Sequence, residues 1–102
     1  ENRRAIELAT DARGRRFEII DLPAPIVTEH LSDDRNCDCY ANYILVNGGL
    51  IASAFGTPQD ALGRKVFEKA FPGRRIEMLS TVHIGMGGGS IHCSTQQQPA
   101  TP

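Results

Sequence analysis

The sequence predicts an α/β fold in which a helix flanks a mixed sheet, and three observations lead to this prediction. Residues 43–46 and 50–55 are apolar runs separated by Asn47-Gly48-Gly49, and an Asn-Gly pair favours the turn of a β-hairpin. Residues 58–71 then carry apolar side chains at helical spacing, and residues 75–80 form another strand-like run. A strand–helix–strand order after an antiparallel hairpin places parallel and antiparallel pairs in one sheet.

The predicted helix over residues 58–71 has start and stop signals at both ends. Thr57 is a suitable N-cap, Pro58 suits the first helical position, and Pro72-Gly73 ends the pattern. Its apolar positions form one stripe, which comprises Ala61, Leu62, Val66, Phe67, Ala70 and Phe71.

The remaining segments give weaker signals. Residues 2–12 have the composition of a short helix, and residues 17–22 form an apolar, β-branched run that predicts a strand ending at Pro23. The polar residues 28–38 are expected to form a loop, and residues 96–102 a frayed tail.

Composition excludes several classes of protein. Among the 102 residues, 11 are Lys or Arg and 12 are Asp or Glu, so the net charge of −1 gives no basic field for nucleic acid or an anionic membrane. No apolar run is long enough to span a membrane. Three cysteines, two of them as Cys37-Asp38-Cys39, do not suggest a disulfide framework, so we expect a cytoplasmic location. Because the chain starts at Glu1 without Met or a signal sequence, we interpret it as a piece of a longer product.

Cys93 is the candidate nucleophile. It follows Gly87-Gly88-Gly89, where backbone without Cβ atoms can approach a ligand closely or hold a thiol in a cleft. The alternative is that Cys93 is a small buried apolar residue beside Ile91. His92 is adjacent, but neighbours in a strand point to opposite faces, so we interpret it as structural rather than as the base.

Two other kinds of site fit the residues less well. The glycine run could cradle a phosphate, but no Lys-Ser or Lys-Thr follows it and the dinucleotide pattern is incomplete. A metal site would have to combine the single Cys-x-Cys with scattered histidines, which is unlike zinc-binding spacing, so we expect none; its candidate ligands are Cys37, Cys39, His30, His83 and His92.

A longer motif resembles a known family. The segment GGGSIHCSTQQQPA, residues 87–100, is similar to the carboxy-terminal signature of agmatine deiminases in the bacterial-type peptidylarginine deiminase family. YANYILVNGG at residues 40–49 and FEIIDLP at residues 17–23 resemble the same family in the same order. The sequence departs from the family pattern at Ser90, Ser94 and Asp38-Cys39.

This resemblance implies a pentein fold, a five-bladed α/β propeller of ββαβ units, of which residues 1–102 would be the carboxy-terminal part. It implies hydrolysis of the guanidinium of agmatine to N-carbamoylputrescine and ammonia without a cofactor, with Cys93 as nucleophile and Gly87, Gly88 and Gly89 lining the substrate channel. A peptidyl or free arginine substrate and a non-catalytic binding module remain alternatives. The family's histidine base and guanidinium-binding carboxylates lie in earlier blades, and none of Glu29, Asp33, Asp34 and Asp38 matches them. We therefore expect the chain alone to be inactive, and to self-associate through exposed blade edges.

Overall fold

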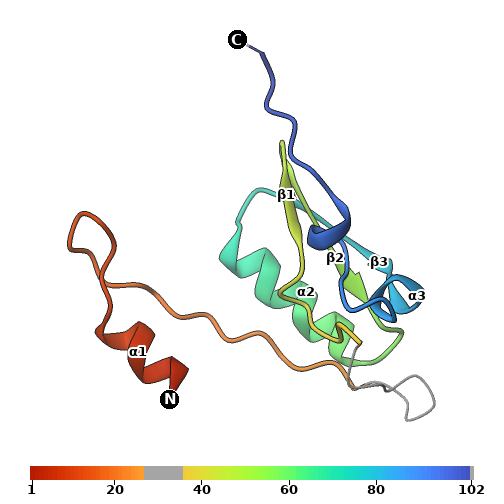
Figure 1. Ribbon diagram of the computed structural model, residues 1–102, viewed down its shortest axis with the longest axis horizontal. Coiled ribbons are helices and arrows are strands. Elements are labelled where there is room, and N and C mark those ends of the chain that lie inside the picture. The colour runs from red at the N-terminus through yellow and green to blue at the C-terminus, as the bar shows by residue number, and fades with distance from the viewer. Residues whose placement is uncertain (27–35, 102) are drawn as a thin grey trace.

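The computed structural model describes residues 1–26 and 36–101 (Figure 1). Their helices and strands are α1 (Asn2–Leu8), β1 (Ile44–Val46), β2 (Gly49–Ala54), α2 (Gln59–Ala70), β3 (Arg75–Ser80) and α3 (Val82–Gly85). A 3-10 turn at His92–Ser94 follows α3. The short helix α3 has no counterpart among the elements expected from the sequence.

The sheet is mixed, as the sequence predicts. Its order is β1-β2-β3; β1 pairs antiparallel to β2, and β2 pairs parallel to β3. The hairpin closes tightly, with Val46 opposite Gly49 across a turn in which Gly48 has a φ of 74°. That left-handed conformation is accessible to glycine at little cost, which explains the Asn-Gly turn signal.

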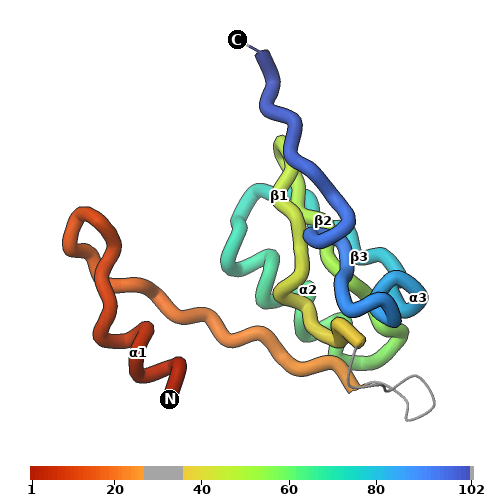
Figure 2. The backbone as a smooth tube through the Cα atoms, viewed as in Figure 1, coloured from red at the N-terminus to blue at the C-terminus, as the bar shows by residue number. Residues whose placement is uncertain are grey.

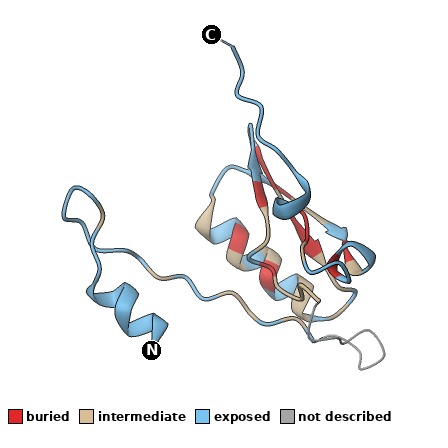
Figure 3. Ribbon diagram, viewed as in Figure 1, coloured by how far each residue is buried: buried red, intermediate tan, exposed pale blue. Residues whose placement is uncertain are grey.

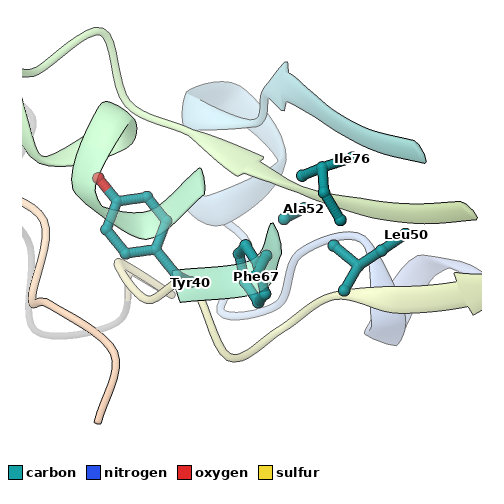
Figure 4. Close-up of a cluster of buried hydrophobic side chains, with 5 residues drawn as sticks. All are labelled: Tyr40, Leu50, Ala52, Phe67 and Ile76. Carbon is teal, nitrogen blue, oxygen red and sulfur yellow. The ribbon is translucent and has the colours of Figure 1, made fainter. Parts of the chain in front are cut away.

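Helix α2 connects the parallel strands β2 and β3 and covers one face of the sheet (Figure 1). Leu50 and Ala52 alternate along β2 and so point to this face, and Ile76 is the partner of Leu50 on β3. Together with Tyr40 and Phe67 they form the hydrophobic core (Figure 4). The apolar stripe predicted for residues 58–71 is buried only in part, because Phe67 lies in this core whereas Ala61 and Leu62 are exposed.

The carboxylate of Asp60 fastens the start of α2 to two other segments. It accepts a hydrogen bond of 2.6 Å from the hydroxyl of Tyr40 and bonds of 3.1, 2.8 and 3.3 Å from the backbone N–H groups of Phe55, Gly56 and Thr57. The predicted capping role of Thr57 is wrong: Pro58 occupies the N-cap position, and no side chain caps the helix there. Burial and the bond to Asp60 raise the pKa of Tyr40 to about 12.

The amino-terminal segment lies to one side of the sheet, as the backbone trace shows (Figure 2). Helix α1 ends at Leu8, earlier than the predicted residue 12, because Asp11 forms a competing turn. Its Oδ1 accepts the backbone N–H groups of Arg13 and Arg15, each at 2.9 Å. No residue of α1 is buried (Figure 3).

The strand predicted for residues 17–22 is wrong. This segment is extended, but the nearby chain contributes only an isolated bridge between Thr10 and Arg16. A strand needs a neighbour to accept its hydrogen bonds, and none lies beside residues 17–22 within the part that the structure describes. The segment instead lines an apolar groove with Ile20 and Leu22, against Tyr43 and Phe71.

Other expectations fall partly or wholly outside the described residues. Most of the loop predicted for residues 28–38 does so, and with it Glu29, His30, Asp33 and Asp34. Residues 96–101 are exposed and belong to no helix or strand; that this tail frays stays a prediction. None of the helices in the described ranges has the length and apolar character needed to cross a membrane.

We predict that replacing Asp60 with Ala lowers the free energy of unfolding by about 2–4 kcal/mol, because it leaves the buried Tyr40 hydroxyl and several backbone donors without their acceptor. Urea denaturation followed by circular dichroism measures the change. Glu68→Ala is the matched control, since Glu68 is an exposed carboxylate on the same helix. Equal stability of the two variants would show that the Asp60 hydrogen bonds contribute nothing net.

Candidate functional site

Cys93 lies in the 3-10 turn His92–Ser94, directly after the glycine run, and is exposed. The alternative that Cys93 is a buried apolar residue is therefore wrong for this structure, whereas its neighbour Ile91 is buried. The strand geometry assumed for His92 and Cys93 is therefore wrong. The turn is closed by hydrogen bonds from the N–H of Ser94 to the carbonyl of Ile91 and from the N–H of Thr95 to that of His92, each at 3.2 Å.

The side chain of Asn42 holds this turn in place. Its Oδ1 accepts the backbone N–H of His92 at 2.8 Å and that of Cys93 at 3.3 Å. Its Nδ2 donates to the Sγ of Cys93 at 3.1 Å. One amide thus fixes both the backbone around the thiol and the thiol itself. Asn42 lies just before β1, so the sheet determines where it sits.

These hydrogen bonds also change the acidity of the thiol. The amide of Asn42 donates to the sulfur and lowers the pKa of Cys93 below its ordinary value, and the backbone N–H groups of Ser90 and Cys93 act in the same direction. Donors to the sulfur favour the charged form, so the thiolate fraction near neutral pH is raised.

The glycine run shapes the space around Cys93. Gly88 has a φ of 86°, a backbone conformation that residues other than glycine rarely adopt. A Cβ on Gly89 would lie 2.9 Å from the Cβ of Cys93, so the close approach there requires glycine. The N–H groups of Gly87 and Gly88 bond to the carbonyls of Ile84 and Gly85, which leaves them unavailable to a phosphate and argues against the phosphate-cradle alternative. The prediction that these glycines line a substrate channel stays a prediction.

Two contacts anchor the glycine run to the rest of the fold. The hydroxyls of Ser53 on β2 and Ser90 hydrogen-bond at 2.7 Å, and both side chains are fully buried. Ser53 alternates with Leu50 and Ala52, so this contact lies on the face of the sheet opposite α2. At the other end of the run, the carbonyl of Gly85 accepts the N–H of Cys37 at 3.1 Å.

The cysteines converge, although they do not form a metal site. The Sγ atoms of Cys37 and Cys39 are 3.8 Å apart, and Asn42 Nδ2 lies 3.4 Å from Cys37 Sγ. All three cysteines are free thiols. Within residues 1–26 and 36–101 no group of three or more potential ligands is placed to hold a metal ion; His30 lies outside these ranges.

The structure does not bring a histidine to Cys93 within the described ranges. The imidazole of His92 lines a different cavity, with Tyr43, Leu45 and Gln97, while His83 lies exposed on α3. The interpretation of His92 as structural is compatible with this placement, although the strand geometry behind it is wrong.

Sequence reasoning missed Asn42 as a site residue. The signal was present, because Asn42 lies in the YANYILVNGG motif that carries the resemblance. The local pattern around Asn42, however, does not predict that its hydrogen-bond partners lie some fifty residues later in the chain.

The arrangement defines a class of protein. Strands β1, β2 and β3 with the crossover helix α2 form a ββαβ unit of the kind that penteins repeat, and an exposed thiol of lowered pKa follows the glycine run. The model of the Porphyromonas-type peptidyl-arginine deiminase family matches residues 1–99. The chain belongs to this family.

Individual relatives agree with this assignment. A relative from Streptomyces coelicolor is 44% identical over 92 residues, which are 90% of this chain and 27% of the relative. The solved agmatine deiminase of Enterococcus faecalis has a TM-score of 0.87 at 26% identity, covering 96% of this chain and 31% of that one. A C. jejuni agmatine deiminase, a Cys-to-Ser variant with substrate bound, has a TM-score of 0.70 at 27% identity, over 79% of this chain and 24% of that one. The prediction of a partial pentein is confirmed, and the chain spans less than a third of these relatives.

We predict that Asn42→Ala slows the alkylation of Cys93 by iodoacetamide at pH 7 severalfold, because losing the Nδ2 donor raises the pKa of the thiol. Asn42→Asp should slow it too, since it keeps an acceptor for the backbone but places an anion beside the sulfur. Mass spectrometry of the alkylated peptide across pH 6–10 measures the rate. Asn47→Ala, in the hairpin turn, is the control, and a rate profile shared by all four proteins would contradict the assignment.

Proposed function

We propose that this chain is the carboxy-terminal, nucleophile-bearing part of a pentein hydrolase that acts on agmatine, with Cys93 as the nucleophile. The observation that carries the proposal is the exposed Cys93 thiol, whose sulfur accepts a hydrogen bond from Asn42 and whose pKa is lowered. Relatives named as agmatine deiminases support the reaction class. Cysteine-to-serine replacement in the C. jejuni relative with bound substrate is the change expected to stop a thiolate-dependent reaction.

The proposed chemistry proceeds in two steps. The Cys93 thiolate attacks the guanidinium carbon of agmatine, the carbon–nitrogen bond to one terminal nitrogen breaks, and ammonia leaves after gaining a proton. Water then attacks the same carbon of the resulting amidino-cysteine, which restores the thiol and releases N-carbamoylputrescine. A guanidinium is a delocalised cation, so the reaction also needs carboxylates to hold it and a base to move protons.

This chain supplies only part of that machinery in the proposal. Of the four acidic residues considered from the sequence, the structure describes only Asp38. Within the described ranges the side chain that hydrogen-bonds to the Cys93 sulfur is that of Asn42, not a histidine. Because the chain spans about 27–31% of the relatives' length, we assign the base and the guanidinium-binding carboxylates to the other blades. Glycines Gly87, Gly88 and Gly89 would line the channel beside the thiol.

Peptidyl arginine is the second candidate substrate, because the matching family model is described as a peptidyl-arginine deiminase. Both substrates present the same guanidinium to Cys93 and differ in the tail that carries it. No cofactor enters either reaction. We place the protein in the cytoplasm on the strength of its three free thiols, which a reducing compartment preserves.

A chimera tests the activity. The segment of the E. faecalis agmatine deiminase that this chain matches is replaced by residues 1–102. The release of ammonia and N-carbamoylputrescine is measured with agmatine as substrate, and the release of ammonia is measured separately with a peptidyl arginine. We expect turnover of agmatine that Cys93→Ala reduces at least about 1,000-fold. Ser94→Ala, an exposed neighbour, is the matched control and should retain activity within about threefold.

Two outcomes of this experiment would contradict the proposal. One is a folded chimera that turns over neither substrate, and the other is activity that survives Cys93→Ala. If the chimera does not fold, exchanging residues 87–99 alone gives a second readout, in which acid-quenched mass spectrometry with excess agmatine should find agmatine less one ammonia on Cys93. The isolated chain itself should not turn over.

We further propose that the isolated chain self-associates. Among residues 1–26 and 36–101, eleven large apolar side chains are exposed, namely Ile6, Leu8, Phe17, Ile20, Ile26, Leu45, Val46, Leu62, Leu79, Ile84 and Met86. Strands β1 and β3 have no second neighbour in the described sheet. Surfaces of this kind favour contacts with other chains or blades.

Sedimentation velocity from about 5 to 500 μM should therefore show a sedimentation coefficient that rises with protein concentration, with the midpoint of association in the micromolar range. The substitution Leu79→Lys, on the exposed edge strand β3, should weaken association more than Lys65→Ala on the polar face of α2. A monomer over the whole concentration range would contradict this proposal.

A further inference from the structure

Two thiols of the chain share one amide nitrogen, and the third thiol lies beside one of them. Asn42 Nδ2 lies 3.1 Å from Cys93 Sγ and 3.4 Å from Cys37 Sγ, and Cys39 Sγ lies 3.8 Å from Cys37 Sγ. Cys37 stands centrally in this order, with Cys39 on one side and Cys93 on the other. The reaction proposed above uses Cys93 alone and leaves the Cys37-Asp38-Cys39 motif unexplained.

The thiols differ in the way that sequential redox chemistry requires. Cys93 is exposed and its pKa is lowered, so it meets a solvent oxidant first and as the thiolate. Cys37 is half-buried, and burial together with the neighbouring Cys39 raises its pKa, so it persists as a sheltered thiol. Low-pKa, accessible cysteines beside a resolving cysteine are the ones that oxidise reversibly.

The backbone holds the two cysteines at opposite ends of the glycine run. The N–H of Cys37 bonds to the carbonyl of Gly85, and Cys93 packs against Gly89, where a Cβ would come within 2.9 Å. The amide of Asn42 donates a hydrogen bond to each of the two sulfurs, so Cys37 and Cys93 share one neighbour, and this side chain has to rotate away before the sulfurs can meet.

We propose that Cys93 and Cys37 form a peroxide-reactive pair, in which Cys37 captures oxidised Cys93 as a disulfide and Cys39 then exchanges with it to release Cys93. This modification site goes beyond the proposed hydrolase function and does not depend on agmatine turnover. It acts as a repair route that keeps Cys93 from irreversible oxidation.

Each step balances with hydrogen peroxide as the oxidant. The Cys93 thiolate attacks one peroxide oxygen, the O–O bond breaks, and sulfenic acid and hydroxide form. The Cys37 sulfur attacks the Cys93 sulfur, the S–O bond breaks, and hydroxide leaves with the thiol proton as water. The Cys39 sulfur then attacks Cys37, which forms the Cys37–Cys39 disulfide and returns the proton to Cys93 as a thiol. Overall, two thiols and one peroxide give one disulfide and two waters.

Trypsin separates the products, because Cys37 and Cys39 lie in the peptide of residues 36–64 and Cys93 in that of residues 76–102. The folded chain is treated with one equivalent of hydrogen peroxide, quenched with acid and alkylated. We expect a loss of about 2 Da confined to the first peptide in the unmodified chain, and a cross-link between the two peptides in Cys39→Ser. In Cys37→Ser, cross-linking should be at least about tenfold slower, and a second equivalent of hydrogen peroxide should then take the Cys93 sulfenic acid to the sulfinic acid, a gain of about 32 Da over the thiol.

Cys39→Ser and Cys37→Ser serve as matched controls for each other, since the two positions are two residues apart and only one is predicted to resolve Cys93. The unmodified chain in urea gives a second test, because unfolding should abolish the preference for Cys37 over Cys39 in the first cross-link. The proposal is overturned if Cys37→Ser cross-links as fast as Cys39→Ser. It is also overturned if Cys93 of the unmodified folded chain reaches the sulfinic acid while Cys37 and Cys39 remain open to alkylation.

Discussion

The carboxylate of Asp60 is the contact on which the positions of the other functional elements depend. It binds Tyr40 from the segment before β1, the backbone of Phe55 and Gly56 at the end of β2, and it belongs to the first turn of α2. Three parts of the chain that pack on each other thus share one charged acceptor in a half-buried position. Because hydrogen bonds to charged groups are stronger than neutral ones, this acceptor fixes the geometry of the β2–α2 corner.

The candidate site follows from that corner. Tyr40 is held by Asp60, and Asn42 stands two residues further along the same segment, where it bonds to His92 and Cys93. On the opposite face of the sheet from α2, the Ser53–Ser90 hydrogen bond fixes the other end of the turn. The thiol is therefore positioned by two independent contacts with the sheet, which explains how an exposed cysteine after a glycine run has a defined orientation. The same contacts bring Cys37 into reach of Cys93.

Elements with strong local signals could be predicted, and those that needed a distant partner could not. The hairpin of β1 and β2 and the strand β3 were predictable because the Asn-Gly turn and the apolar runs act over a few residues. The run at residues 17–22 has the same composition but is no strand, since β structure depends on a neighbouring edge that its sequence does not encode. Helix α1 ended early because Asp11 offered the backbone other hydrogen bonds, and the capping residue of α2 was misassigned because Asp60 reaches back to the preceding turn.

The sequence by itself determined the mixed α/β unit, the family resemblance and Cys93 as the candidate nucleophile, because these depend on periodicity and on a contiguous motif around residues 87–100. Only the tertiary structure decided that Asn42 orients and acidifies Cys93, that Cys37 and Cys39 gather beside it, and that His92 faces elsewhere. The physical reason is that a hydrogen bond acts over about 3 Å in space, while Asn42 and Cys93 are separated along the chain by the whole sheet.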